Sequence, residues 1–176
     1  MENPFAAIGA PPEGEDPRQQ LLYLQSIVAA FEKTPNPRIK PLQKQLGTAI
    51  ENLAVSVERG DPPAQIGQRF QRDIRDLRVQ TFDLVLVVVN QFRATLRVKL
   101  QAGMAPPQRL DMELLQRALG EYAQAVRKMI GAMKKGDAQT AKEAGEMMDR
   151  ANAMLDQSRE QMTQSSDAEP GTVAGG

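Results

Sequence analysis

The chain has 176 residues and contains neither Cys nor His. These absences exclude disulfides, thiolate chemistry, the commonest transition-metal ligand and the commonest general base. The 22 basic side chains equal the 22 acidic ones, and a neutral chain is poorly suited to nucleic acid. Many Ala and nine Met residues are strong helix formers, so the composition predicts an all-α protein.

We predict one helical domain over residues 17–162, between a disordered arm at 1–16 and a disordered tail at 163–176. Pro and Gly interrupt the arm, while Ser, Gly, Pro and Ala dominate the tail. The apolar island at residues 4–8 is either a strap on the bundle or a docking motif. No signal peptide is visible, and no apolar run reaches the ~18 residues of a membrane span, so we expect a cytoplasmic protein.

Two helices are predicted before residue 60. The first begins at Asp16 and Pro17, which suit an N-cap and a first turn, and ends before the Pro-rich break at 35–37. The second follows Pro41 and ends near Gly60. Their apolar stripes comprise Leu21, Leu24, Val28 and Phe31, with Leu22 and Ile27 beside them, and then Leu42, Leu46, Ile50, Leu53 and Val57.

The stretch 62–103 is predicted to be one long helix, about 60 Å in length, with two apolar stripes. The first comprises Ile66, Phe70, Ile74, Leu77, Thr81, Leu84, Val88 and Phe92, and the second Val79, Phe82, Leu86, Val89, Arg93, Leu96 and Leu100. At about 100° per residue the stripes lie roughly 125° apart. The apolar run 84–89 alone could form a buried strand, but both stripes continue through it in register.

The last two helices are predicted to form an antiparallel hairpin. Lys134, Lys135, Gly136 and Asp137 supply in succession a helix end and the N-cap of the next helix. The two stripes comprise Leu115, Leu119, Tyr122, Val126, Met129 and Met133, and then Ala141, Ala144, Met148, Ala151, Leu155, Ser158 and Met162. The whole pattern predicts an elongated antiparallel bundle of four to five helices.

The second stripe of the long helix has two interpretations. It is either buried by other helices of the same chain, or it is a groove for a partner or for a second copy of the chain, as the heptad-like steps would suit. The candidate partner-binding residues on it are Val79, Phe82, Leu86, Val89 and Leu96.

A row of four arginines, Arg69, Arg72, Arg75 and Arg78, is the most prominent basic feature. These side chains either pair with Asp73, Asp76 and acids of a neighbouring helix, or contact an anionic partner such as lipid headgroups. The surplus of basic residues in this helix and of acidic residues at 137–169 also fits pairing between helices.

Catalytic and metal-binding patterns are absent from the sequence. There is no phosphate-binding glycine loop and no nucleophile elbow, and the acidic pair Glu143 and Glu146 lies off the apolar seam. We therefore predict a protein without enzyme activity, cofactor or metal, which acts as an adaptor, scaffold or small helical chaperone. The alternative is a peripheral membrane-surface or anionic-ligand-binding protein that uses the four arginines.

Overall fold

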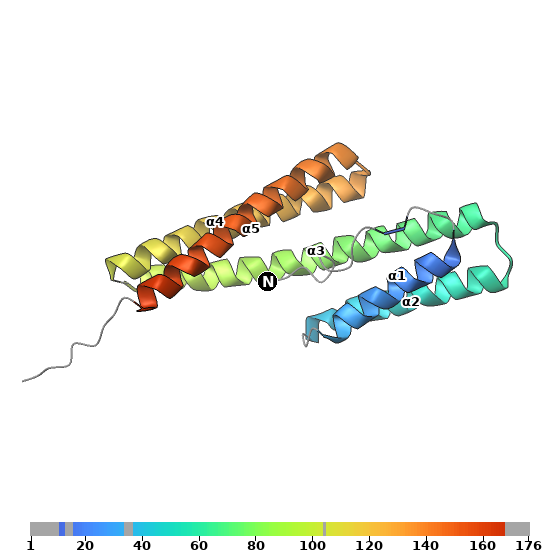
Figure 1. Ribbon diagram of the computed structural model, residues 1–176, viewed down its shortest axis with the longest axis horizontal. Helices are drawn as coiled ribbons and strands as arrows, with labels where there is room; N and C mark the ends of the chain where they lie inside the picture. The colour runs from blue at the N-terminus through green and yellow to red at the C-terminus, as the bar shows by residue number, and fades with distance from the viewer. Residues whose placement is uncertain (1–10, 13–15, 34–36, 104, 168–176) are drawn as a thin grey trace, which may run out of the picture. The chain divides into compact units, whose positions relative to one another are not determined.

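The structure, a computed structural model, describes residues 11–12, 16–33, 37–103 and 105–167, and these residues form helices without any strand (Figure 1). The helices are α1 (Pro17–Glu32), the 3₁₀ helix η1 (Pro37–Ile39), α2 (Lys40–Glu58), α3 (Pro63–Gln101), α4 (Pro106–Lys135) and α5 (Ala138–Asp167). The predicted all-α fold is confirmed. The apolar run at 84–89 is helical, and α3 continues through it without interruption.

Local capping signals set the ends of several helices. The Asp16 side chain accepts a hydrogen bond from the Arg18 backbone N–H at 2.9 Å and so caps α1. Gly136 closes α4 in the left-handed conformation, with φ at 69°. These caps lie where the sequence predicts them.

The end of α5 differs from the prediction. The helix continues to Asp167, whereas the sequence assigns residues 163–167 to the tail. The Thr163 hydroxyl donates to the Arg159 carbonyl at 3.0 Å, and no Gly or Pro occurs before Pro170. Nothing in this polar stretch therefore stops the helix.

The chain forms two compact units, residues 1–85 and 86–176, and α3 contributes residues to both. In the first unit, α1, α2 and the beginning of α3 surround one apolar cluster. Its members are Tyr23, Leu24, Ile27, Phe31, Ile39, Leu42, Leu46, Ala49, Leu53, Ile66, Phe70, Ile74 and Leu77. The edge of one ring faces the other in the pair Tyr23 and Phe70, whose centroids are 6.2 Å apart.

Two helices of the first unit turn a slightly different side toward the core than the sequence predicts. On α1, Tyr23 is buried while Leu22 is exposed. On α2, Ser56 is buried while Val57 is exposed. The hydroxyl of Ser56 accepts a hydrogen bond from Arg69 at 2.9 Å, which compensates the burial of this polar group.

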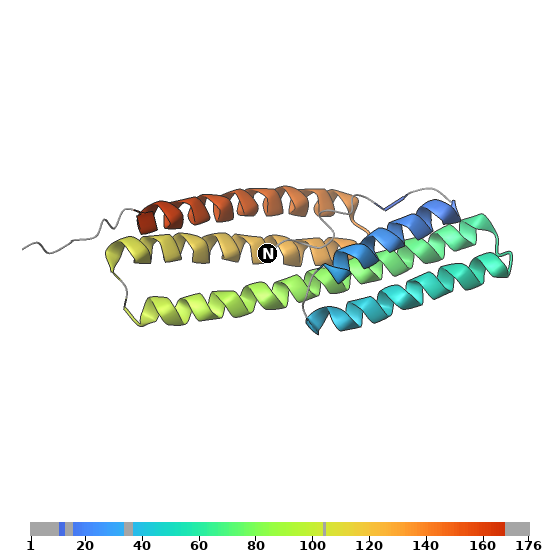
Figure 2. The ribbon, with the colours of Figure 1, turned by 60° about the horizontal axis from the view of Figure 1, so that its bottom comes forward.

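The second unit contains the end of α3 and the α4–α5 hairpin, whose two helices lie side by side (Figures 1 and 2). Ala144, Ala151 and Ser158 are fully buried along the seam of α5, as the spacing predicts. Small side chains let two helices approach closely. At the edge of the seam, Lys128 Nζ lies 2.6 Å from Glu143 Oε2.

We predict that Leu24→Ala destabilises the protein far more than Leu22→Ala, because Leu24 is 0% exposed and Leu22 is 65% exposed. A cavity in the core should lower the free energy of unfolding by about 2–5 kcal/mol, whereas the surface change should stay within about 0.5 kcal/mol. Urea denaturation measures both values. Equal losses would mean that α1 turns another side toward the core.

The N-cap of α5 should make stability depend on pH. Hydrogen bonds from the Thr140 side chain and backbone, at 2.6 and 3.0 Å, lower the pKa of Asp137 in the folded protein. A lowered folded pKa means that this stabilisation is present above the ordinary pKa of Asp and is lost as the pH falls through the folded value.

Asp137→Asn keeps an N-cap but removes the charge. We expect the difference in unfolding free energy between the wild type and this variant to shrink as the pH is lowered from about 6 to about 2. Urea titrations of both proteins across that range measure it. A difference that stays constant would contradict the pKa shift.

Candidate protein-binding face of α3

The predicted partner-binding residues are mostly buried. Phe82 is 4% exposed, and Val79, Val89 and Leu96 are also buried, while Leu86 is half-buried. A buried side chain offers no open surface to a partner. The burial therefore favours the interpretation that the second stripe serves the chain's own packing, and a binding role for these five residues stays a prediction.

Within the second unit, α3 approaches α4 at Gly120. A Cβ atom at Gly120 would lie 3.2 Å from Nη2 of Arg93, so the missing side chain leaves room for the guanidinium. The Nε of Arg93 is buried and has no hydrogen-bond partner. This arginine occupies a position on the second stripe where the neighbouring members, Val89 and Leu96, are apolar.

The side of α3 that remains exposed in the second unit is unusually apolar. We define the outer face of α3 as the exposed residues Val87, Gln91, Phe92, Ala94, Thr95, Val98 and Lys99. Val87 and Phe92 are each 48% exposed and Val98 is 66% exposed. Lys99 is the one charged member of this set. The exposed Arg97 borders this set, so the face combines three large exposed apolar side chains with two cations and no acid.

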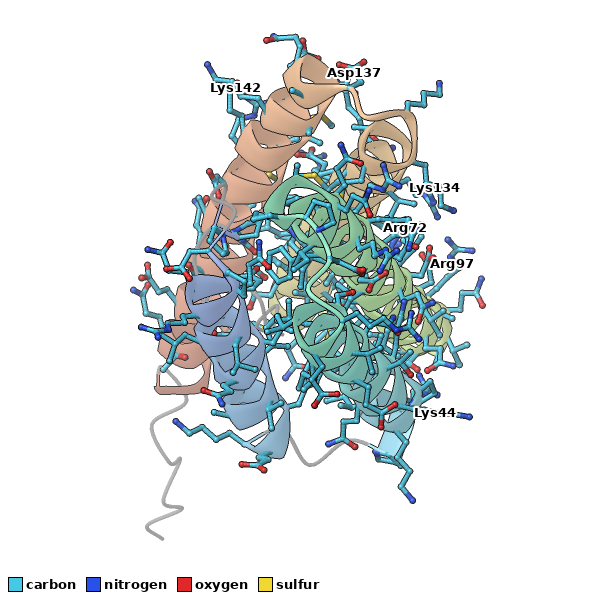
Figure 3. All side chains as sticks on the ribbon, turned by 90° about the vertical axis from the view of Figure 1, so that its right-hand side faces the viewer. Lys44, Arg72, Arg97, Lys134, Asp137 and Lys142 are labelled. Atoms are coloured by element: carbon cyan, nitrogen blue, oxygen red, sulfur yellow. The ribbon has the colours of Figure 1, made fainter. Side chains whose placement is uncertain are left out.

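The spacing on the outer face matches a helix-packing seam. Val87, Gln91, Ala94 and Val98 follow one another at steps of four, three and four, which places them in one line along the helix. Phe92 lies roughly 130° around the helix from that line, at about 100° per residue. On the other side is Arg97, whose side chain points away from the helices in Figure 3.

Most of this face was not predicted, because its residues lie outside the two apolar stripes of α3. Phe92 is the one residue of the outer face that belongs to a predicted stripe, the first. One feature of the sequence indicates the outer face of α3. Between Leu84 and Leu110 there are four basic residues and no acidic one.

The row of arginines does not form a uniform basic patch. Arg69 donates to Asp61 at 2.7 Å and to the Ser56 hydroxyl at 2.9 Å. Arg72 and Arg75 lie 3.7 and 3.9 Å from Asp73 and Asp76, and both arginines are largely exposed. Because an acid follows each of these two arginines, their charge is largely offset at the surface.

The Arg78 side chain is half-buried, and its charge affects Tyr23 in the first unit. Burial raises the pKa of the Tyr23 hydroxyl, and the charge of Arg78 opposes this rise. Arg78 therefore belongs to the edge of the core, and the four predicted residues have three different environments.

A small surface pocket between α2 and α3 contains the remaining polar cluster of the first unit. Asn52, Ser56, Arg69 and Asp73 line it together with apolar core residues. Asn52 Nδ2 donates to Asp73 at 3.3 Å, and Arg69 is bonded to Ser56. These groups satisfy one another, so the pocket has a structural explanation.

Neither a metal cluster nor a membrane-crossing helix occurs among the described residues. No group of three or more acidic side chains in them is arranged to hold a metal ion. No helix that they form has both the length and the apolar character of a membrane-crossing segment.

Comparison with protein families, curated proteins and solved structures gives no match for this chain. The site must therefore be interpreted from its own geometry.

Replacing Arg93 tests the packing of α3 on α4. Arg93→Met keeps a long unbranched side chain and removes the buried Nε–H that has no partner, so we expect the free energy of unfolding to rise by about 1 kcal/mol. Arg97→Met is the matched control at an exposed position one turn away, and should change it by about 0.5 kcal/mol or less. Urea denaturation measures both. A clear loss of stability in Arg93→Met would mean that the guanidinium makes a favourable buried interaction.

Proposed function

We propose that this chain is a non-enzymatic protein–protein interaction module, an adaptor or scaffold of the cytoplasm, and that the outer face of α3 binds its partner. One observation carries the proposal: three large apolar side chains, Val87, Phe92 and Val98, are exposed within a single segment of α3. Fully burying one such side chain contributes about 1.5–3 kcal/mol. Large apolar side chains left exposed on one segment are typical of interaction sites.

The geometry of the face suits a helix as the bound element. The seam of Val87, Gln91, Ala94 and Val98 is straight along α3, and its inner positions are a small residue and a flexible polar one. Small residues at the centre of a seam let a partner helix approach, and flanking larger residues then contact it from both ends.

The alternative function, binding to a membrane surface or an anionic ligand through the arginine row, has less support. Arg72 and Arg75 are exposed, but each lies beside an aspartate. Arg69 is held by Asp61, so releasing it for an anion would leave that carboxylate unpaired. The outer face of α3 has no acid to offset its charge, and its apolar residues are the larger feature.

Removing the apolar character of the seam should abolish partner capture without unfolding the protein. We compare the tagged full-length wild type with the double variant Val87→Ser with Val98→Ser, using affinity capture from the native cell followed by mass spectrometry. The wild type should recover one protein at a fixed stoichiometry, and the double variant should not. The midpoint of urea unfolding should be nearly unchanged, because both side chains are exposed.

The matched control is Leu22→Ser with Val57→Ser, which removes two exposed apolar side chains from the first unit. This control should recover the same partner as the wild type. Capture that survives the α3 substitutions, or that is lost equally in the control, would overturn the assignment of this face.

A further inference from the structure

The basic residues beside the outer face of α3 indicate which charge a partner would carry. Four basic residues and no acidic one occur between Leu84 and Leu110. Of these four, Arg109 pairs with Glu113 at 2.9 Å, and Arg93 packs against Gly120. Arg97 and Lys99 are exposed, and neither forms an ion pair with another residue that the structure describes.

We infer that the outer face of α3 binds an amphipathic helix of a different protein, which presents an apolar stripe bordered by Asp and Glu side chains. This inference rests on the proposed function and adds the charge of the partner to it. Val87 and Val98 contact the apolar stripe, while Arg97 and Lys99, on the two sides of their line, pair with the acidic border. Complementary charges at the rim of an interface select the partner and orient it.

The outer face of a second copy does not have that chemistry. Two outer faces placed together would bring Arg97 and Lys99 near the same cations of the other copy, with no acid from residues 84–110 to separate them. The described exposed residues of α5 include four acids, Glu146, Asp149, Asp156 and Glu160, and three bases, Lys142, Arg150 and Arg159, but no large apolar side chain. Neither of these two surfaces of a second copy supplies both required features. The surface of a second copy that has both is α2, where Val55 is exposed beside Glu51 and Glu58, and the sedimentation experiment below tests it.

A lipid surface fits the face less well than a helix does. Helices that lie on membranes present bulky Trp, Phe and Leu side chains along their apolar side. Here Phe92 is the one bulky residue, and Gln91, Ala94 and Thr95 lie between it and the two valines. This mixture of small and polar residues favours packing against a second helix.

The test uses the full-length chain and two fluorescent synthetic peptides of equal length. Both are amphipathic helices with the same leucine stripe, and one has Glu while the other has Lys along the border of that stripe. Fluorescence anisotropy at low salt should give a dissociation constant at least about tenfold lower for the Glu peptide, and added salt should reduce the difference.

The variant Arg97→Glu with Lys99→Glu should reverse this preference. The matched control Arg72→Glu with Arg75→Glu makes the same change of charge on α3 in the first unit, and should retain the preference of the wild type. The double variant Val87→Ser with Val98→Ser should raise the dissociation constant of the Glu peptide at least about tenfold, because it removes the apolar contacts.

Several outcomes would overturn the inference. Equal binding of the two peptides, or no binding of either, would exclude an acidic helix while leaving capture through Val87 and Val98 as a separate result. Sedimentation of the chain as a dimer that the Val87→Ser with Val98→Ser variant disrupts would assign the face to a second copy. Flotation with phosphatidylserine vesicles that the same variant abolishes would assign it to lipid.

Discussion

The fold depends on one helix that must complete two separate cores. In the first unit, α3 contributes Ile66, Phe70, Ile74 and Leu77 to the apolar cluster; in the second, Val89 and Leu96 are buried. The first stripe of α3 is buried mainly in the first unit, where the apolar cluster lies. Phe92, which continues the first stripe into the second unit, is consequently left 48% exposed.

The sequence predicts most clearly those features that short-range chemistry determines. Asp16, Gly136 and Asp137 each satisfy backbone groups or conformations within a few residues of themselves, so helix ends are visible without knowledge of the fold. The seam of α5 is equally visible, because Ala144, Ala151 and Ser158 recur at helical spacing and a tight turn fixes α4 beside them.

Features that depend on neighbouring helices were not predictable in the same way. On α1, leucines occur on several sides, and only the positions of α2 and α3 decide that Tyr23 is buried and Leu22 is not. The same holds for Ser56 and Val57 on α2, where the hydrogen bond from Arg69 favours burial of the serine. The apolar run 84–89 has no polar side at all, so its periodicity could not indicate which residues stay exposed.

The distribution of charge on α3 is hard to explain by stability alone. Arg93 and Arg97 are one turn apart, and like charges at this spacing destabilise a helix by about 0.2–0.5 kcal/mol. An acid near them would remove that cost, and the chain has 22 acidic residues, yet none occurs between Leu84 and Leu110. The acidic partner helix that we propose would account for this separation, because its carboxylates would supply the compensating charge in the complex.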